Sequence, residues 1–136
     1  MKLKKLSDTV TISEQLTETD VMQLHALGYR AILCNRPDEE CTQLAQFADI
    51  KSNAEEYGIQ CRYYPIAPTG VSRQTAKQFG EILSELPKPV VAYCRSGKRS
   101  ISLWALWAKS HLPDSEVKLK LQEFGMDKDS IAALVS

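Results

Sequence analysis

Short apolar runs alternate along the chain with longer stretches in which apolar residues recur every three or four positions. Four of the runs have the length and composition of strands, at 10–13, 29–34, 59–64 and 90–93. The longer stretches predict helices at 17–28, from near 41 to 57, at 72–86, from 100 onward, at about 114–124 and at 127–135. The pattern therefore predicts strands and helices in regular alternation, followed by two short helices.

This alternation determines the expected fold class. Strands joined through helices by short connections imply right-handed crossovers and a mainly parallel central sheet with helices on both faces. At 136 residues the chain has the size of one domain. We therefore expect a single α/β domain over residues 1–136, and we expect its ligands to bind beyond the carboxyl ends of the strands.

Composition narrows the classes of function. The chain is 43% hydrophobic and 25% charged, with 17 basic and 17 acidic residues, so no overall basic field points to a nucleic-acid partner. No stretch is long and apolar enough to span a bilayer, and no membrane partner is expected. Four Cys at irregular spacing, with no hydrophobic signal segment after the first residues, predict free thiols in a reducing, cytoplasmic compartment.

The segment 90–100 carries the strongest chemical signal. Its apolar strand ends at Cys94, and the following residues Arg95, Ser96, Gly97 and Lys98 lead directly into a predicted helix. Such a junction directs backbone N–H groups and the positive end of the helix dipole at one point, which binds an anion. The nearby cations stabilise a thiolate, and Gly97 permits backbone angles closed to other residues. A buried structural Cys in a basic surface turn is the alternative interpretation.

Other candidate residues follow neighbouring strands. Arg36 and Asp38 lie in the loop after the second strand, on the same expected rim as Cys94, and either act in the pocket or pair with each other at a helix start. Cys34 ends that strand, where it either packs or forms a disulfide with Cys94 after oxidation.

With these residues in view, the sequence resembles the bacterial phosphatase-like domain of unknown function that occurs alone and within beta-lactamase-hydrolase-like proteins. The resemblance covers most of the chain and implies the dual-specificity branch of the protein tyrosine phosphatase fold. It rests on Gln15-Leu16-Thr17, Gly28-Tyr29-Arg30, Asn35-Arg36-Pro37-Asp38, Tyr64-Pro65-Ile66, the loop 92–100 and Leu103-Trp104-Ala105.

The resemblance implies roles for the loop residues. Cys94 would be the nucleophile that attacks phosphorus, and residues 95 to 99 would form the anion cradle, with Arg95, Ser96, Gly97, Lys98 and Ser100 as anion-binding residues and Arg36 as a further one. Arg99 is the candidate for the clamp on the phosphoryl oxygens, because a guanidinium fork matches two oxygens at once.

Three positions depart from the phosphatase pattern. Tyr93 stands where phosphatases place His, and Ser100 stands six positions after the Cys, where they place Arg. The loop 65–72 also lacks the Asp that usually acts as general acid, so Asp38 is the candidate substitute. The shorter Cys-Arg-Ser-Gly-x-Arg-Ser loop is similar to the active loop of rhodanese sulfurtransferases.

The sequence thus predicts a Cys-dependent phosphatase-like hydrolase of phosphate esters, with Cys94, Arg99 and Asp38 as catalytic residues. A rhodanese-like sulfurtransferase carrying a Cys94 persulfide and a binder of anionic ligands without catalysis are the alternatives. The expected partner is a small anionic or phosphorylated molecule. We expect no cofactor and no metal, because His25 and His111 lack partners at metal-ligand spacing.

Overall fold

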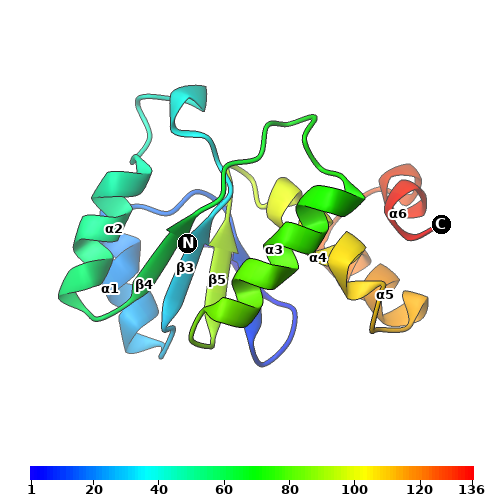
Figure 1. Cartoon of the computed structure of the whole chain (residues 1–136), viewed down its shortest axis with the longest axis horizontal. Coiled ribbons are helices and arrows are strands. Elements are labelled where there is room, and N and C mark those ends of the chain that lie inside the picture. The colour runs from blue at the N-terminus through cyan, green and yellow to red at the C-terminus, as the bar shows by residue number, and fades with distance from the viewer.

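A five-stranded sheet runs through the middle of the molecule in the computed structural model, which describes residues 1–136 (Figure 1). The strand order is β1-β2-β5-β3-β4. The strands are β1 (Leu3–Lys5), β2 (Val10–Ser13), β3 (Ala31–Cys34), β4 (Gln60–Tyr63) and β5 (Val90–Tyr93). Only β1 runs antiparallel to its neighbour, so the predicted mainly parallel sheet is confirmed.

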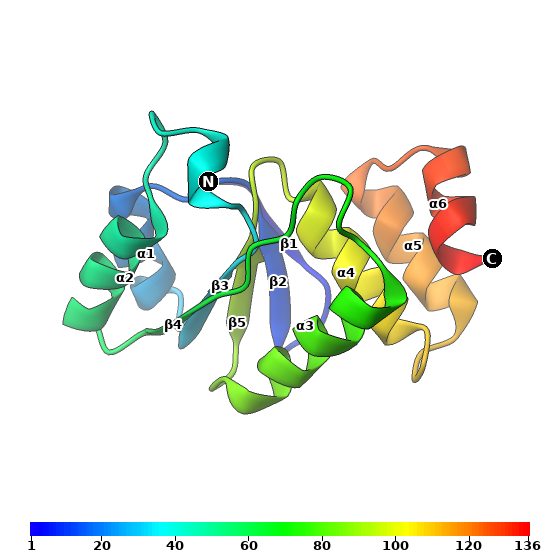
Figure 2. The same cartoon turned by 45° about the horizontal axis from the view of Figure 1, so that its top comes forward.

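Helices cover both faces of this sheet (Figure 2). The helices are α1 (Glu18–Ala26), α2 (Phe47–Glu56), α3 (Arg73–Glu85), α4 (Lys98–Ala108), α5 (Asp114–Phe124) and α6 (Lys128–Val135), with one 3-10 turn, η1 (Asp38–Glu40). Helices α1 and α2 pack on one face, and α3 to α6 lie on the other side. No helix is both long and apolar enough to pass through a lipid bilayer.

The side-chain alternation of the central strands explains the two layers of core. On β5, Val91 and Tyr93 point to the α1 and α2 layer, whereas Val90 and Ala92 point to the α3 and α4 layer. All four are buried, since a strand covered on both faces has no solvent side.

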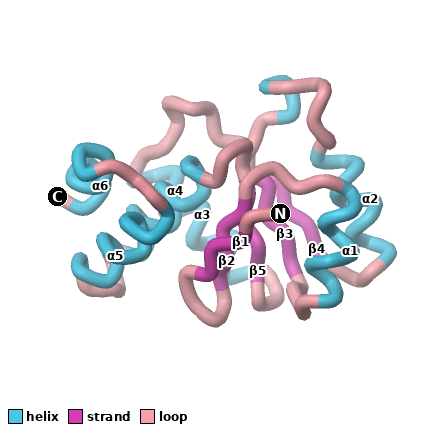
Figure 3. Tube along the Cα trace, turned by 180° about the vertical axis from the view of Figure 1, so that it is seen from behind, coloured by secondary structure: helices cyan, strands magenta, loops and turns pink.

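The parallel register brings four connections to one end of the sheet. Ser13, Tyr93 and Cys34 are aligned across β2, β5 and β3, and Tyr63 continues the row on β4. The loops that follow these residues therefore lie together beyond the carboxyl ends of the strands, as the views from the front and from behind show (Figures 1 and 3). The loops that were expected to lie beside Cys94 at this edge of the sheet are therefore found there.

The N-terminal half of the chain differs from the sequence prediction in three places. Strand β1 has only three residues, too few to show a periodic pattern, and it was not predicted. The first helix was expected to extend to residue 28, but Leu27 lies after its end and is 62% exposed. The second helix was expected to begin near Cys41, yet α2 begins at Phe47, where Gln46 and Asp49 form a capping box.

The packing of α3 on α4 yields a prediction about stability. A Cβ atom added at Gly80 of α3 would collide with the indole ring of Trp107 on α4. A Gly→Ala substitution in a helix interior normally raises the free energy of unfolding by about 1 kcal/mol. We expect Gly80→Ala instead to lower the free energy of unfolding by about 1–3 kcal/mol, as overpacking does, when it is measured by urea denaturation. The same change should stabilise a Trp107→Ala variant, because the collision is then absent.

Candidate active site

The Cys94 side chain lies at the amino end of α4, in the segment that leaves β5 and enters the helix (residues 94–99, the Cys94 loop). Gly97, the N-cap residue of α4, adopts φ +90°, a left-handed conformation that glycine allows at little cost. This turn brings the Gly97 N–H to 3.2 Å from the Cys94 Sγ, to which it donates. The thiol thus lies at a helix N-terminus, as the loop residues predicted, and it is buried.

Several loop amides remain available to a ligand. The N–H groups of Arg95, Ser96 and Arg99 donate to no other atom of the protein, whereas the Lys98 N–H contacts the Ser96 hydroxyl at 3.3 Å. Unpaired amides at a helix start, together with the helix dipole, favour an anion at this position. The loop therefore contains free N–H donors beside the Cys94 sulfur.

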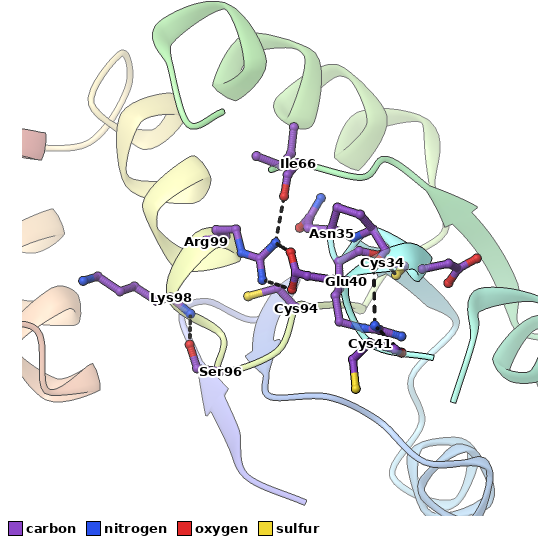
Figure 4. Close-up of polar contacts among 12 residues, drawn as sticks. Cys34, Asn35, Glu40, Cys41, Ile66, Cys94, Ser96, Lys98 and Arg99 are labelled. Carbon is purple, nitrogen blue, oxygen red and sulfur yellow. Dashed lines mark hydrogen bonds and ion pairs between the residues drawn. The ribbon is translucent and has the colours of Figure 1, made fainter. Parts of the chain in front are cut away.

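Arg99 turns its guanidinium inward, to the same side of the loop as Cys94 (Figure 4). It donates two hydrogen bonds of 2.7 Å to the two carboxylate oxygens of Glu40, and a third of 2.8 Å to the carbonyl of Ile66. The hydrogen bonds to Glu40 raise the pKa of Arg99, and Cys94 contributes to the same shift. The arginine fork thus already holds one carboxylate, in a geometry that a phosphoryl group also fits.

Glu40 was not singled out from the sequence. It belongs to η1, 59 positions before Arg99, and no local pattern distinguishes it from Glu39. The hydrogen bonds from Arg99 hold its pKa below the usual value, with weaker contributions from Arg36 and Arg95. Glu40 is therefore the carboxylate that the fold brings to the Cys94 loop.

Asp38 has a different partner. Its Oδ1 accepts a hydrogen bond of 2.9 Å from the Phe47 N–H at the start of α2, and its own N–H donates to the Tyr63 hydroxyl. Asp38 was predicted as the general acid or as a partner of Arg36, and no ion pair joins the two residues. Its carboxylate instead supports the connection between η1 and α2.

Arg36 was expected to bind the anion, but its side chain braces the connection between β3 and α2. It is 1% exposed and donates to the carbonyls of Pro37, Cys41 and Ala45 and to the side chain of Gln46. A buried guanidinium needs such partners because desolvation is costly. Arg36 thus has a structural role in this connection, and its anion-binding role stays a prediction. The same contacts hold residues 41–46 as a loop rather than a helix.

Ser100 was expected to bind the anion and is fully buried beneath the loop. Its hydroxyl donates at 2.9 Å to the Asn35 side-chain oxygen, and the Asn35 amide donates at 2.9 Å to the Tyr64 carbonyl. These hydrogen bonds join the first turn of α4 to the residues that follow β3 and β4. In this structure Ser100 positions the loop, while Arg95, Ser96 and Lys98 have exposed side chains around it.

The remaining cysteines have distinct surroundings. Cys34 lies across from Tyr93 and donates to the Arg36 carbonyl, and burial raises its pKa to about 11. Burial also raises the pKa of Cys61, to about 12. These environments support packing for both thiols, and a disulfide between Cys34 and Cys94 stays a prediction. The pKa of Cys41 is lowered although Glu39 and Glu40 precede it in the sequence, because its thiolate accepts from backbone N–H groups.

A cleft of about 520 Å³ opens beside the loop, between α6 and the segment before α3. Its polar side includes Lys98 and Arg99, and its apolar side includes Val71, Met126 and Leu134. A larger hollow of about 720 Å³ between α3 and α4 contains no residue of the Cys94 loop. The smaller cleft therefore offers the space for an organic group attached to an anion held by Arg99.

Comparison with known proteins assigns the family. Residues 2–110 match the model for the "Beta-lactamase hydrolase-like protein, phosphatase-like domain". The chain belongs to this family. A Beta-lactamase hydrolase-like protein of Agrobacterium fabrum is 27% identical over 106 residues, which are 78% of this chain and 25% of the relative. The chain thus spans about a quarter of the length of that relative.

Solved structures of several phosphatases share the fold. A candidate phosphatase of Neisseria meningitidis superposes with a TM-score of 0.84 at 32% identity, covering 96% of this chain and 94% of the other. Kinase associated phosphatase gives a TM-score of 0.73 at 14% identity, covering 92% and 83%. The core catalytic domain of a PP-IP phosphatase from S. cerevisiae gives 0.75 at 14%, covering 97% and 82%. The predicted phosphatase-like α/β fold is therefore confirmed.

Proposed function

We propose that this phosphatase-like domain hydrolyses phosphate esters with Cys94 as its nucleophile. The observation that carries the proposal is the position of the thiol, which lies at the start of α4 with free amides around it and the Arg99 fork on the same side. This arrangement offers a nucleophile and an anion cradle at one point. The family and the shared fold support the same reaction.

The proposed reaction has two steps. In the first, the Cys94 thiolate forms a bond to phosphorus while the bond from phosphorus to the ester oxygen breaks, and the leaving oxygen takes up a proton. In the second, water attacks the phosphocysteine, the bond from sulfur to phosphorus breaks, and phosphate and the thiolate are released. The loop amides and Arg99 stabilise the negative charge that develops on the phosphoryl oxygens.

The cleft beside Arg99 supports a small phosphorylated molecule as the substrate. Its volume of about 520 Å³ is typical of pockets that bind small molecules. Its apolar wall faces a polar side formed by the start of α4. An anion bound at the loop amides would place its organic part in this cleft.

Two assays on the purified chain test the proposal. Hydrolysis of p-nitrophenyl phosphate is expected, and sulfur transfer from thiosulfate to cyanide is expected to be absent. Cys94-dependent sulfur transfer without ester hydrolysis would instead support the rhodanese-like alternative. Binding of phosphate without either reaction would support an anion-binding protein.

A further inference from the structure

A phosphatase of this kind needs a proton donor for its leaving group, and the expected donors are not at the loop. The segment 65–72 contains no acidic residue, and the Asp38 carboxylate contacts the Phe47 N–H. The ion pair between Glu40 and Arg99 is the only one that involves a residue of the Cys94 loop. Glu40 is thus the remaining carboxylate in contact with the candidate catalytic residues.

The position of Glu40 is determined by contacts on both sides of it. Before it, the Asp38 N–H donates to the Tyr63 hydroxyl at 2.9 Å. After it, the Arg36 guanidinium donates to the Cys41 carbonyl at 3.2 Å. The Glu40 side chain is 20% exposed and the Arg99 side chain 13% exposed, so the pair is partly shielded from water. Because the backbone on both sides of Glu40 is held in place, its carboxylate needs little reorganisation to transfer a proton at the loop.

We propose that Glu40 is the general acid of the reaction and donates its proton to the leaving-group oxygen. This role rests on the phosphatase function proposed above. In Figure 4 both N–H donors of the Arg99 fork contact the Glu40 carboxylate. A phosphoryl group that takes these donors displaces the carboxylate and leaves it beside the bound ester. Glu40 is therefore both the group that occupies Arg99 in the free protein and the acid in the complex.

Replacement of Glu40 by a phosphate at Arg99 also changes the protonation of Glu40. In the free protein, the carboxylate faces Arg99 of α4, Arg36 of the connection and Arg95 of the loop, which together keep its pKa low. When a phosphate takes over Arg99, Glu40 loses its nearest cation and gains a neighbouring anion. Both changes favour the protonated form. Substrate binding thus prepares the acid that the first step uses.

Glu40 gives up one proton in the first step and regains one in the second. The Glu40 proton moves to the ester oxygen as the bond from that oxygen to phosphorus breaks and the bond from sulfur to phosphorus forms. The resulting carboxylate then takes a proton from the attacking water as the bond from sulfur to phosphorus breaks. The net reaction converts an ester and water into an alcohol and phosphate.

The test compares Glu40→Gln with wild-type protein on esters of increasing leaving-group pKa. Glutamine keeps the shape of the side chain but donates no acidic proton. We expect kcat to fall by about 10²–10⁴-fold for an alkyl phosphate and only a few-fold for p-nitrophenyl phosphate, whose leaving group needs no proton. The fall of wild-type kcat at high pH should also disappear, and KM should decrease because a neutral amide competes for Arg99 less strongly than a carboxylate does.

Glu39→Gln is the matched control, because it removes the same charge from the neighbouring, exposed position and is expected to leave kcat within about twofold. Urea denaturation of each variant checks the fold, and Glu40→Asp should restore part of the alkyl-phosphate activity. If Glu40→Gln lowered kcat by the same factor for every ester and left the pH profile of kcat unchanged, the role of Glu40 would be overturned while the phosphatase function stayed intact. Absence of Cys94-dependent hydrolysis in the wild-type protein would overturn both proposals.

Discussion

Cys94→Ser should lower the rate of p-nitrophenyl phosphate hydrolysis by at least about 10³-fold, because a hydroxyl is not ionised near neutral pH and cannot replace a thiolate nucleophile. The fold should persist. Cys94 is 1% exposed and its Sγ accepts only one N–H, that of Gly97, and a serine oxygen can accept the same bond in a slightly smaller volume.

The matched control is Cys61→Ser on β4. It makes the same chemical change outside the loop, and we expect it to retain hydrolysis. Circular dichroism and urea denaturation compare the folds of the two variants. If Cys94→Ser kept most of the wild-type rate while remaining folded, another group would have to be the nucleophile.

Arg99→Lys should reduce kcat/KM by about 10²-fold or more, far beyond the effect of Arg95→Lys. The Arg99 fork reaches two oxygens of one carboxylate, whereas a lysine ammonium is a single point charge without that geometry. Arg95 has an exposed side chain, and its backbone carbonyl accepts from the Gln15 N–H. Its substitution should alter the rate by only a few-fold, through the local charge.

The same two variants separate catalysis from stability. Arg99→Lys also removes hydrogen bonds to Glu40 and Ile66, so its free energy of unfolding is measured alongside its kinetics. Rates are then compared under conditions where both variants are fully folded. Equal kinetic losses at Arg95 and Arg99 would show that the loop presents a different cation to the substrate.

Local signals in the sequence determined the strand, loop and helix that carry Cys94. The apolar run 90–93, Gly97 at the turn and the apolar spacing of α4 act over neighbouring residues, and the structure places each as predicted. The expected helices at 72–86 and about 114–124 were also located, since their caps, Ser72 before α3 and Gly125 after α5, depend on residues within one turn. The parallel sheet followed from the order of these elements.

The tertiary structure decided which charged residues meet at the loop. Arg36, Asp38 and Glu40 lie within five positions on one connection. The local sequence does not show which of these charged side chains reaches the Cys94 loop. The fold buries Arg36 among carbonyls, directs Asp38 to the start of α2 and brings Glu40 to Arg99. The physical reason is that a side chain in an irregular connection has no periodic direction, so its partner depends on elements brought close only by folding.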